Sequence, residues 1–154
     1  MIEVNEQIEV ASDPQTVWNL LSDPRAVVEC LEGAQLGDQQ EDGSYDASIT
    51  VKFGPAKVAF RANVALELDP AGRKGNVTSR GRDKQGGARF QTKMSFRVED
   101  RVDPPGSRIP IEAQVEISGK LASIIETGAS MVVKRMTKDF SEQLANRLAG
   151  ADAG

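Results

Sequence analysis

Residues 120–149, near the C-terminus, contain no proline and only one glycine, Gly128. Apolar side chains recur there every three or four residues, which places them along one stripe of an α-helix. At about 1.5 Å per residue, a helix of this length would measure about 45 Å. The stripe comprises Leu121, Ile124, Ile125, Gly128, Met131, Val132, Met136, Phe140, Leu144 and Leu148. One helix this long, apolar along one side, predicts a large curved sheet for it to lie against.

Such a sheet is predicted by residues 34–119, in which apolar and polar side chains alternate. Strands with one apolar and one polar face are typical of an antiparallel sheet with one solvated side. Turn sequences such as Gly54-Pro55 separate the alternating segments, so we expect six consecutive strands in a meander. Clear alternation lies at residues 45–53, 58–68, 90–98 and 109–117, and a weaker strand at 74–82.

The N-terminal part predicts one further strand, at residues 3–10, and then two short helices. The tripeptides Ser12-Asp13-Pro14 and Ser22-Asp23-Pro24 open the helices, because Ser or Asp caps free N–H groups and Pro suits the first turn. Gln15 offers a capping box with Ser12, and Gly33 is placed to end the second helix. The expected architecture is therefore α+β: a curved antiparallel sheet of about seven strands on a long C-terminal helix, with two short helices after strand one.

Length and composition indicate one domain, residues 1–149, followed by a disordered tail at 150–154. The single cysteine, Cys30, cannot form an internal disulfide, and we expect a packed thiol in a reducing compartment. No apolar run approaches the roughly 20 residues of a membrane-spanning helix, and residues 1–4 lack the features of a signal peptide. We therefore expect a cytoplasmic protein that associates at most peripherally with the inner face of the cell membrane.

The chain contains no histidine. Histidine is the side chain that most often acts as acid, base or metal ligand near neutral pH, and zinc sites built on His or on several Cys are excluded. The sequence also has no phosphate-binding loop, dinucleotide fingerprint or nucleophile elbow. We expect no metal, no cofactor and no catalytic residue.

Charge is distributed unevenly along the chain. Residues 1–50 carry eleven acids and one base, residues 51–108 thirteen bases and six acids, and residues 109–154 five bases and six acids, for a net charge of −4. Basic residues on the expected outer face of two neighbouring strands form a candidate docking surface for an acidic partner or an anionic membrane: Arg80, Arg82, Arg89, Lys93 and Arg97. The alternative is cross-strand pairing with Glu99, Glu112 and Glu116. Nucleic acid is not expected, because no aromatic residues interleave with these bases.

The order of elements resembles the helix-grip fold of the START / Bet v 1-like (SRPBCC) superfamily. Residues 17–24 (Val-Trp-Asn-Leu-Leu-Ser-Asp-Pro) and 30–34 (Cys-Leu-Glu-Gly-Ala) resemble the opening of the CoxG-like family of carbon monoxide dehydrogenase subunits, although Glu32 stands where proline is usual. The similarity continues at Phe53-Gly54-Pro55, at residues 79–83 and at residues 118–122, so it extends over nearly the whole chain.

The resemblance implies an accessory protein of a molybdenum hydroxylase such as carbon monoxide dehydrogenase. Its expected role is to aid recruitment of that enzyme to the membrane or its assembly, or to handle a lipid or quinone. The alternative is an enzyme, because the same superfamily includes cyclases and dehydratases that act on polyketide or aromatic substrates. The absence of histidine favours the accessory role.

The inner face of the expected sheet combines small side chains with Phe and Met. Small residues, including Ala47, Ala88 and Ala113, would leave a cavity under the helix, and Phe and Met would line it; the alternative is a packed core. The candidate lining is Trp18, Val28, Leu31, Phe53, Phe60, Ala62, Val64, Phe90, Met94, Phe96, Ile125, Gly128, Met131, Val132 and Met136, with Gly81 among the small residues. Glu6 and Tyr45 are candidate polar anchors; the alternatives are a bulge or strand end that leaves Glu6 in water, and an ordinary rim position for Tyr45.

Overall fold

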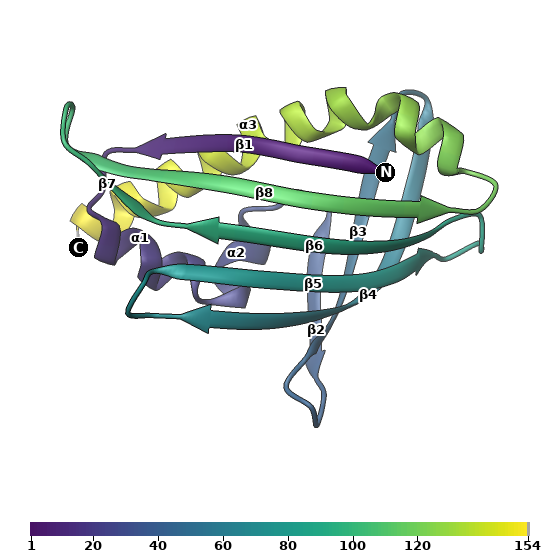
Figure 1. Ribbon diagram of the computed structural model, residues 1–154, viewed down its shortest axis with the longest axis horizontal. Coiled ribbons are helices and arrows are strands. Elements are labelled where there is room, and N and C mark those ends of the chain that lie inside the picture. The colour runs from purple at the N-terminus through teal and green to yellow at the C-terminus, as the bar shows by residue number, and fades with distance from the viewer. Residues whose placement is uncertain (154) are drawn as a thin grey trace.

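Eight antiparallel strands in one sheet and three helices make up the computed structural model of the chain, which describes residues 1–153 (Figure 1). The strands are β1 (Ile2–Val10), β2 (Ala34–Gln39), β3 (Tyr45–Phe53), β4 (Ala56–Asp69), β5 (Lys74–Asp83), β6 (Arg89–Arg97), β7 (Glu99–Arg101) and β8 (Gly106–Ser118). The helices are α1 (Pro14–Leu21), α2 (Pro24–Glu29) and α3 (Ala122–Ala153). The predicted α+β architecture, with a long C-terminal helix and two short helices after β1, is confirmed.

The sheet has the strand order β1-β8-β6-β5-β4-β3-β2, so consecutive strands are neighbours and β1 closes the meander beside β8. The additional strand, β7, is only three residues long and pairs with the start of β8. Figure 1 shows β2 and β3 crossing behind the other strands, with their hairpin projecting below the sheet. Helix α3 continues to Ala153, past residue 149, where the sequence predicted a tail; Gly154 lies outside the described residues.

The two short helices are capped by aspartate. Asp13 accepts hydrogen bonds from the backbone N–H groups of Gln15 (3.1 Å) and Thr16 (3.2 Å), and the hydroxyl of Thr16 donates to it as well (2.5 Å). These bonds stabilise the ionised carboxylate, the Thr16 hydroxyl most of all, and lower the pKa of Asp13. The N-cap of α1 is Asp13, not Ser12 as the predicted capping box required, and the Gln15 side chain donates to Asn19 and accepts from Arg73.

Helix α2 ends earlier than predicted, at Glu29, with Cys30 as its C-cap. Gly33 therefore lies beyond the helix, in the turn before β2, where it adopts a left-handed φ of +80°. A Cβ atom there would come within 2.7 Å of the carbonyl oxygen of Thr50, so the close approach of this turn to β3 also requires glycine.

Helix α3 approaches the sheet mainly at β1, β8 and β3. Most of its predicted stripe faces inward, and Ile125, Val132, Leu144 and Leu148 are buried. The prediction is wrong for two residues of the stripe, because the side chains of Ile124 and Met131 are 48% and 80% exposed. Each precedes a buried residue, Ile125 or Val132, by one position. One position along a helix corresponds to a rotation of about 100° around its axis, so the two side chains point away from the sheet. Ala129, which was not part of the predicted stripe, is buried in their place.

The apolar interior consists of two separate clusters at opposite ends of α3. The first joins β1, α1 and the C-terminal half of α3, and contains Ile8, Val10, Val17, Trp18, Val98, Ile109, Leu144 and Leu148. The second joins the β3–β4 hairpin to the N-terminal half of α3, and contains Phe53, Val58, Phe60, Ala88, Ile125 and Val132. The part of the sheet that lies between the two clusters belongs to neither of them.

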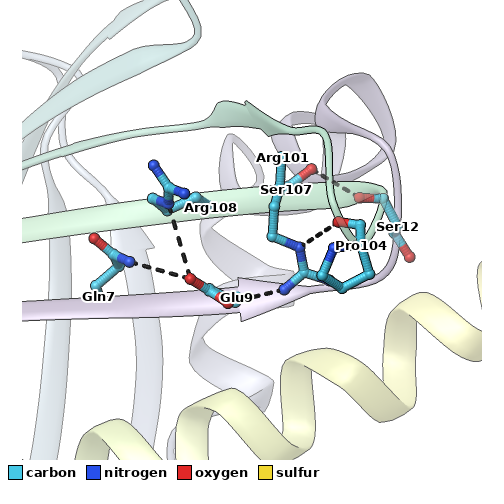
Figure 2. Close-up of polar contacts among 7 residues, drawn as sticks. All are labelled: Gln7, Glu9, Ser12, Arg101, Pro104, Ser107 and Arg108. Atoms are coloured by element: carbon cyan, nitrogen blue, oxygen red, sulfur yellow. Dashed lines mark hydrogen bonds and ion pairs between the residues drawn. The ribbon is translucent and has the colours of Figure 1, made fainter.

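A polar network ties β1 to the β7–β8 corner (Figure 2). The carboxylate of Glu9 accepts a hydrogen bond from Arg101 (3.0 Å) and lies 3.8 Å from the Nε of Arg108. Arg101 also donates to the carbonyl oxygen of Pro104 (2.9 Å), within the corner itself. The buried hydroxyl of Ser107 donates to the backbone carbonyl of Ser12 (2.7 Å), which holds the segment after β1 against β8.

Candidate functional site

The inner face of the sheet carries two cross-strand rows that belong to neither apolar cluster. Strand register places Tyr45, Val64, Ser79, Thr92 and Val115 opposite one another in the first row. The second row, two residues along each strand, contains Leu66, Val77, Met94, Ala113 and Val4. We call these two rows the middle band.

The side chains of the middle band face the interior but are only partly buried. Its side chains are half-buried, apart from the buried Ala113, whereas the clusters on either side contain fully buried residues. The centre of the band lies on β4, β5 and β6, and its ends lie on β1, β3 and β8, the three strands to which α3 makes its main approaches. Inward-facing apolar side chains of this kind are typical of the lining of sites for small apolar molecules.

The first row of the middle band also contains hydroxyl groups. Ser79 and Thr92 are directly opposite each other on β5 and β6, and Tyr45 lies on the same row two strands from Ser79. Within residues 1–150, whose side chains the structure describes, the hydroxyls of these three residues make no hydrogen bond. They can therefore donate to, or accept from, a polar group of a bound molecule.

The structure distributes the predicted lining residues over three environments. Trp18 and Phe96 pack in the first cluster with their ring centroids 6.1 Å apart. Val64 and Met94 lie in the middle band. The second cluster contains Phe53, Phe60, Ile125 and Val132, with Phe90 and Met136 packed against it. Of the remainder, Ala62, Val28 and Leu31 are half-buried. Leu66, Val77 and Val115 belong to the band and were not among the predicted residues, although their strand parity marked them as inward-facing.

Two of the glycines predicted to make room do not do so. A Cβ atom on Gly81 would lie 2.2 Å from the carbonyl oxygen of Arg61 and 2.8 Å from the ring of Phe90, so that ring already fills the space. A Cβ atom on Gly128 would lie 3.6 Å from Phe53, an ordinary contact distance, so this glycine leaves space for a methyl group but not for a ligand. Met131, which was also predicted to line the cavity, is on the exposed side of α3.

Glu6 is half-buried at the side of the sheet rather than in the middle band. It borders a hollow of about 500 Å³ between β1 and α3, together with Ala129, Ser130, Val133 and Lys134. Its strand parity is as predicted, but β1 is an edge strand and the position opens toward solvent beside α3.

A hollow of about 580 Å³ lies where α2, β3 and α3 meet. Leu31, Val51, Met136 and Phe140 give it an apolar wall, and Lys52, Lys57 and Arg135 stand among its charged residues. Cys30 borders the same hollow but is only 1% exposed, and its burial raises the pKa of the thiol.

The predicted basic surface divides into two parts. Arg97 donates to the carboxylate of Glu99 at 2.7 Å, and this pairing raises the pKa of Arg97. Arg80, Arg82 and Arg89 instead line an open groove on the outer face, and Lys93 borders the neighbouring surface. Glu99, the partner of Arg97, lies two residues along the chain and is not a cross-strand neighbour, because Arg97 is opposite Lys74 and Glu99 is opposite Arg108.

Two further properties concern the described residues only. No three His, Cys, Asp or Glu side chains in residues 1–150 gather closely enough to hold a metal ion. None of the helices in this part of the chain is both long and apolar enough to span a membrane.

Several solved structures have the same fold as this chain. A conserved protein from Geobacillus kaustophilus is 20% identical and superposes with a TM-score of 0.83 over 97% of each chain. The Zhui aromatase/cyclase from Streptomyces sp. R1128 is 13% identical, with a TM-score of 0.65 over 96% of this chain and 93% of that one. Ara h 8.0201 is 12% identical, with a TM-score of 0.62 over 97% and 98% of the two chains. At these identities the likeness concerns the fold alone.

Residues 7–149 match the profile of CoxG, a family of carbon monoxide dehydrogenase subunits. The chain therefore belongs to the CoxG family. No functionally curated protein matches it significantly.

Proposed function

We propose that this protein binds a small apolar molecule, such as a lipid or a quinone, over the middle band. The observation that carries the proposal is that two complete apolar clusters flank a band of inward-facing, half-buried apolar side chains. A ligand lying there would contact Val64, Val77 and Met94. Burial of apolar ligand surface would supply the binding free energy, at roughly 25 cal/mol per Å² before the costs of association.

The hydroxyl groups of Tyr45, Ser79 and Thr92 would orient the polar end of such a molecule. A quinone oxygen or a lipid head group accepts hydrogen bonds, and hydroxyls without an internal partner are available to donate them. An amphiphilic ligand therefore fits this interior better than a pure hydrocarbon does.

The wider role we propose is that of an accessory protein for a molybdenum hydroxylase such as carbon monoxide dehydrogenase, aiding its recruitment or assembly. Membership of the CoxG family supports this part of the proposal. Co-purification of the hydroxylase with the tagged protein from its own cells tests it directly, and the absence of any hydroxylase component would contradict it.

An enzyme of the cyclase or dehydratase type is the second candidate, favoured by the Zhui aromatase/cyclase among the proteins that share the fold. Such chemistry needs acid or base groups that converge on the substrate. The middle band offers three hydroxyls, the sequence has no histidine, and Glu6 lies at the side of the sheet. The binding role therefore agrees better with the groups present.

Titration with the fluorescent probe N-phenyl-1-naphthylamine, followed by displacement with a short-chain ubiquinone, tests the binding role. A Met94→Trp substitution fills the middle band and is expected to weaken probe binding at least ~10-fold, about 1.4 kcal/mol. Met131→Trp adds the same side chain on the exposed side of α3 and is the matched control, with binding unchanged. Circular dichroism checks that both variants fold.

Tyr45→Phe separates the two candidate functions. Loss of one hydrogen bond, about 0.5–1.5 kcal/mol, is expected to weaken quinone binding a few-fold while the apolar probe binds as before. An enzyme that used this phenol as its acid would instead lose turnover with little change in substrate binding. Equal affinity of Met94→Trp and wild type for the probe would show that the middle band is not the site.

A further inference from the structure

A groove of about 1200 Å³ runs across the outer face of the sheet, on the side away from α3. It lies between two rows of outward-facing side chains, and the backbone of the row between them forms its floor. In the first wall, Arg61 is directly opposite Arg82, which is directly opposite Arg89. Arg80 stands in the second wall, between Asn63 and Gln91. The groove thus carries four arginines from three adjacent strands.

These four arginines have no ion-pair partner among the side chains that the structure describes. Within residues 1–150, no carboxylate oxygen lies within 4.0 Å of the guanidinium groups of Arg61, Arg80, Arg82 or Arg89. Arg97, on the same face, does have such a partner in Glu99. Like charges directly opposite one another on neighbouring strands destabilise a sheet. A net charge of −4 for the whole chain makes the concentration of positive charge in one groove more notable.

We propose that this groove binds an acidic, extended segment of a partner protein. The planar guanidinium group of arginine can donate two parallel N–H hydrogen bonds to one carboxylate. The ammonium group of lysine does not have this bidentate geometry. The groove crosses six strands, from β2 to β8. Six neighbouring strands are separated by five intervals of about 4.8 Å, so the groove is roughly 24 Å long. An extended chain of about seven residues has this length.

The ends of the groove favour a protein segment over a uniform polyanion. Asp46 on β3 and Glu116 on β8 line it near its two ends, outside the arginines. They would repel the outer phosphates of a nucleic acid but would pair with basic residues that flank an acidic centre. The side chains of the two walls carry no aromatic ring on which bases could stack. A recessed groove also gives a flat membrane surface less access to the arginines than it gives a single chain.

The test uses a fluorescein-labelled peptide, Lys-Glu-Glu-Glu-Glu-Glu-Lys, and its Gln-substituted counterpart, in anisotropy titrations of the whole chain. We expect the Glu peptide to bind and the Gln peptide not to bind. Raising the salt concentration from 50 to 300 mM should weaken binding several-fold. The double variant Arg82→Gln/Arg89→Gln should weaken it at least ~10-fold, whereas Arg97→Gln, which changes an arginine outside the groove, should leave it within ~2-fold.

Stability provides an independent readout. Arg82 faces an arginine on both sides, so Arg82→Gln removes two repulsions and should raise Tm by roughly 1–4 °C. Equal binding of the Glu and Gln peptides, or full affinity in the double variant, would overturn the proposal. So would tighter, Arg82- and Arg89-dependent binding to a 20-nucleotide single-stranded DNA or to vesicles containing phosphatidylglycerol, because the partner would then not be a protein.

Discussion

Individual side chains decide how the ends of the sheet are held. Ser107 is fully buried at the start of β8, and its hydroxyl reaches the carbonyl of Ser12, 95 residues earlier in the chain (Figure 2). The neighbouring ion pairs of Glu9 with Arg101 and Arg108 are partly exposed, and such pairs typically contribute no more than about 1 kcal/mol. The buried hydrogen bond is therefore the more important of the two kinds of contact at this corner.

Ser107→Ala should lower the free energy of unfolding by about 1–2 kcal/mol, because it removes a buried hydrogen bond. Ser95→Ala, on the exposed face of β6, is the control and should change it by less than about 0.5 kcal/mol. Urea denaturation of the two variants and the wild type measures the difference. Equal stability of both variants would mean that the Ser107 hydroxyl does not hold the corner.

At the scale of elements, glycine has different roles in the strands and in α3. Gly81 lies under the ring of Phe90, and Gly75 lies under the ring of Phe96. At both positions β5 has no side chain, and the aromatic ring from β6 occupies that space. Gly128 stands in the middle of α3 at ordinary contact distance from Phe53. The strand glycines are therefore required by close packing, whereas the helix glycine leaves space for a methyl group.

Gly128→Ala should stabilise the protein by about 0.5–1 kcal/mol, because alanine has the higher helix propensity and meets only ordinary contacts. Gly81→Ala should destabilise it by about 1–3 kcal/mol, because the new methyl group would overlap the backbone of β4. Thermal unfolding followed by circular dichroism measures both changes. Shifts of the same sign in the two variants would contradict this assignment of roles.

At the scale of the whole molecule, the sheet separates two surfaces with different chemistry. Its inner face joins α3 through two apolar clusters and leaves the middle band between them. Its outer face carries the arginine groove. A ligand over the band and a partner in the groove would be only one sheet apart, so the two proposed sites can be occupied together.

Cys30 reports on the global packing, because it is buried where α2, β3 and α3 meet. Burial raises the pKa of its thiol, so the reactive thiolate is less populated near pH 8 than in an unfolded chain. Labelling with Ellman's reagent at pH 8 should be at least ~100-fold slower in the native protein than in 6 M guanidinium chloride, since reaction requires opening of the structure. Rapid labelling of the native protein would show that α2 separates readily from α3.

The sequence determined most of the fold, because the relevant signals are local. Alternation predicted the strands of the meander, Asp-Pro pairs predicted the starts of α1 and α2, and the proline-free C-terminal segment predicted α3. The family assignment rests on the same local patterns. The three-residue β7 was too short to give an alternation signal.

The tertiary structure alone decided which inward-facing positions are filled. A glycine opposite a phenylalanine can leave a cavity, or the phenylalanine ring can lie over the glycine and fill the space. The strand register shows that the ring of Phe90 covers Gly81. A rotation of one residue along α3 likewise turned Met131 outward and Ala129 inward. The arginine groove depends on register for the same reason: Arg61 and Arg82 are far apart in the sequence and become neighbours only when β4 pairs with β5. Such distances between side chains are set by long-range pairing, which the local pattern of residues does not encode.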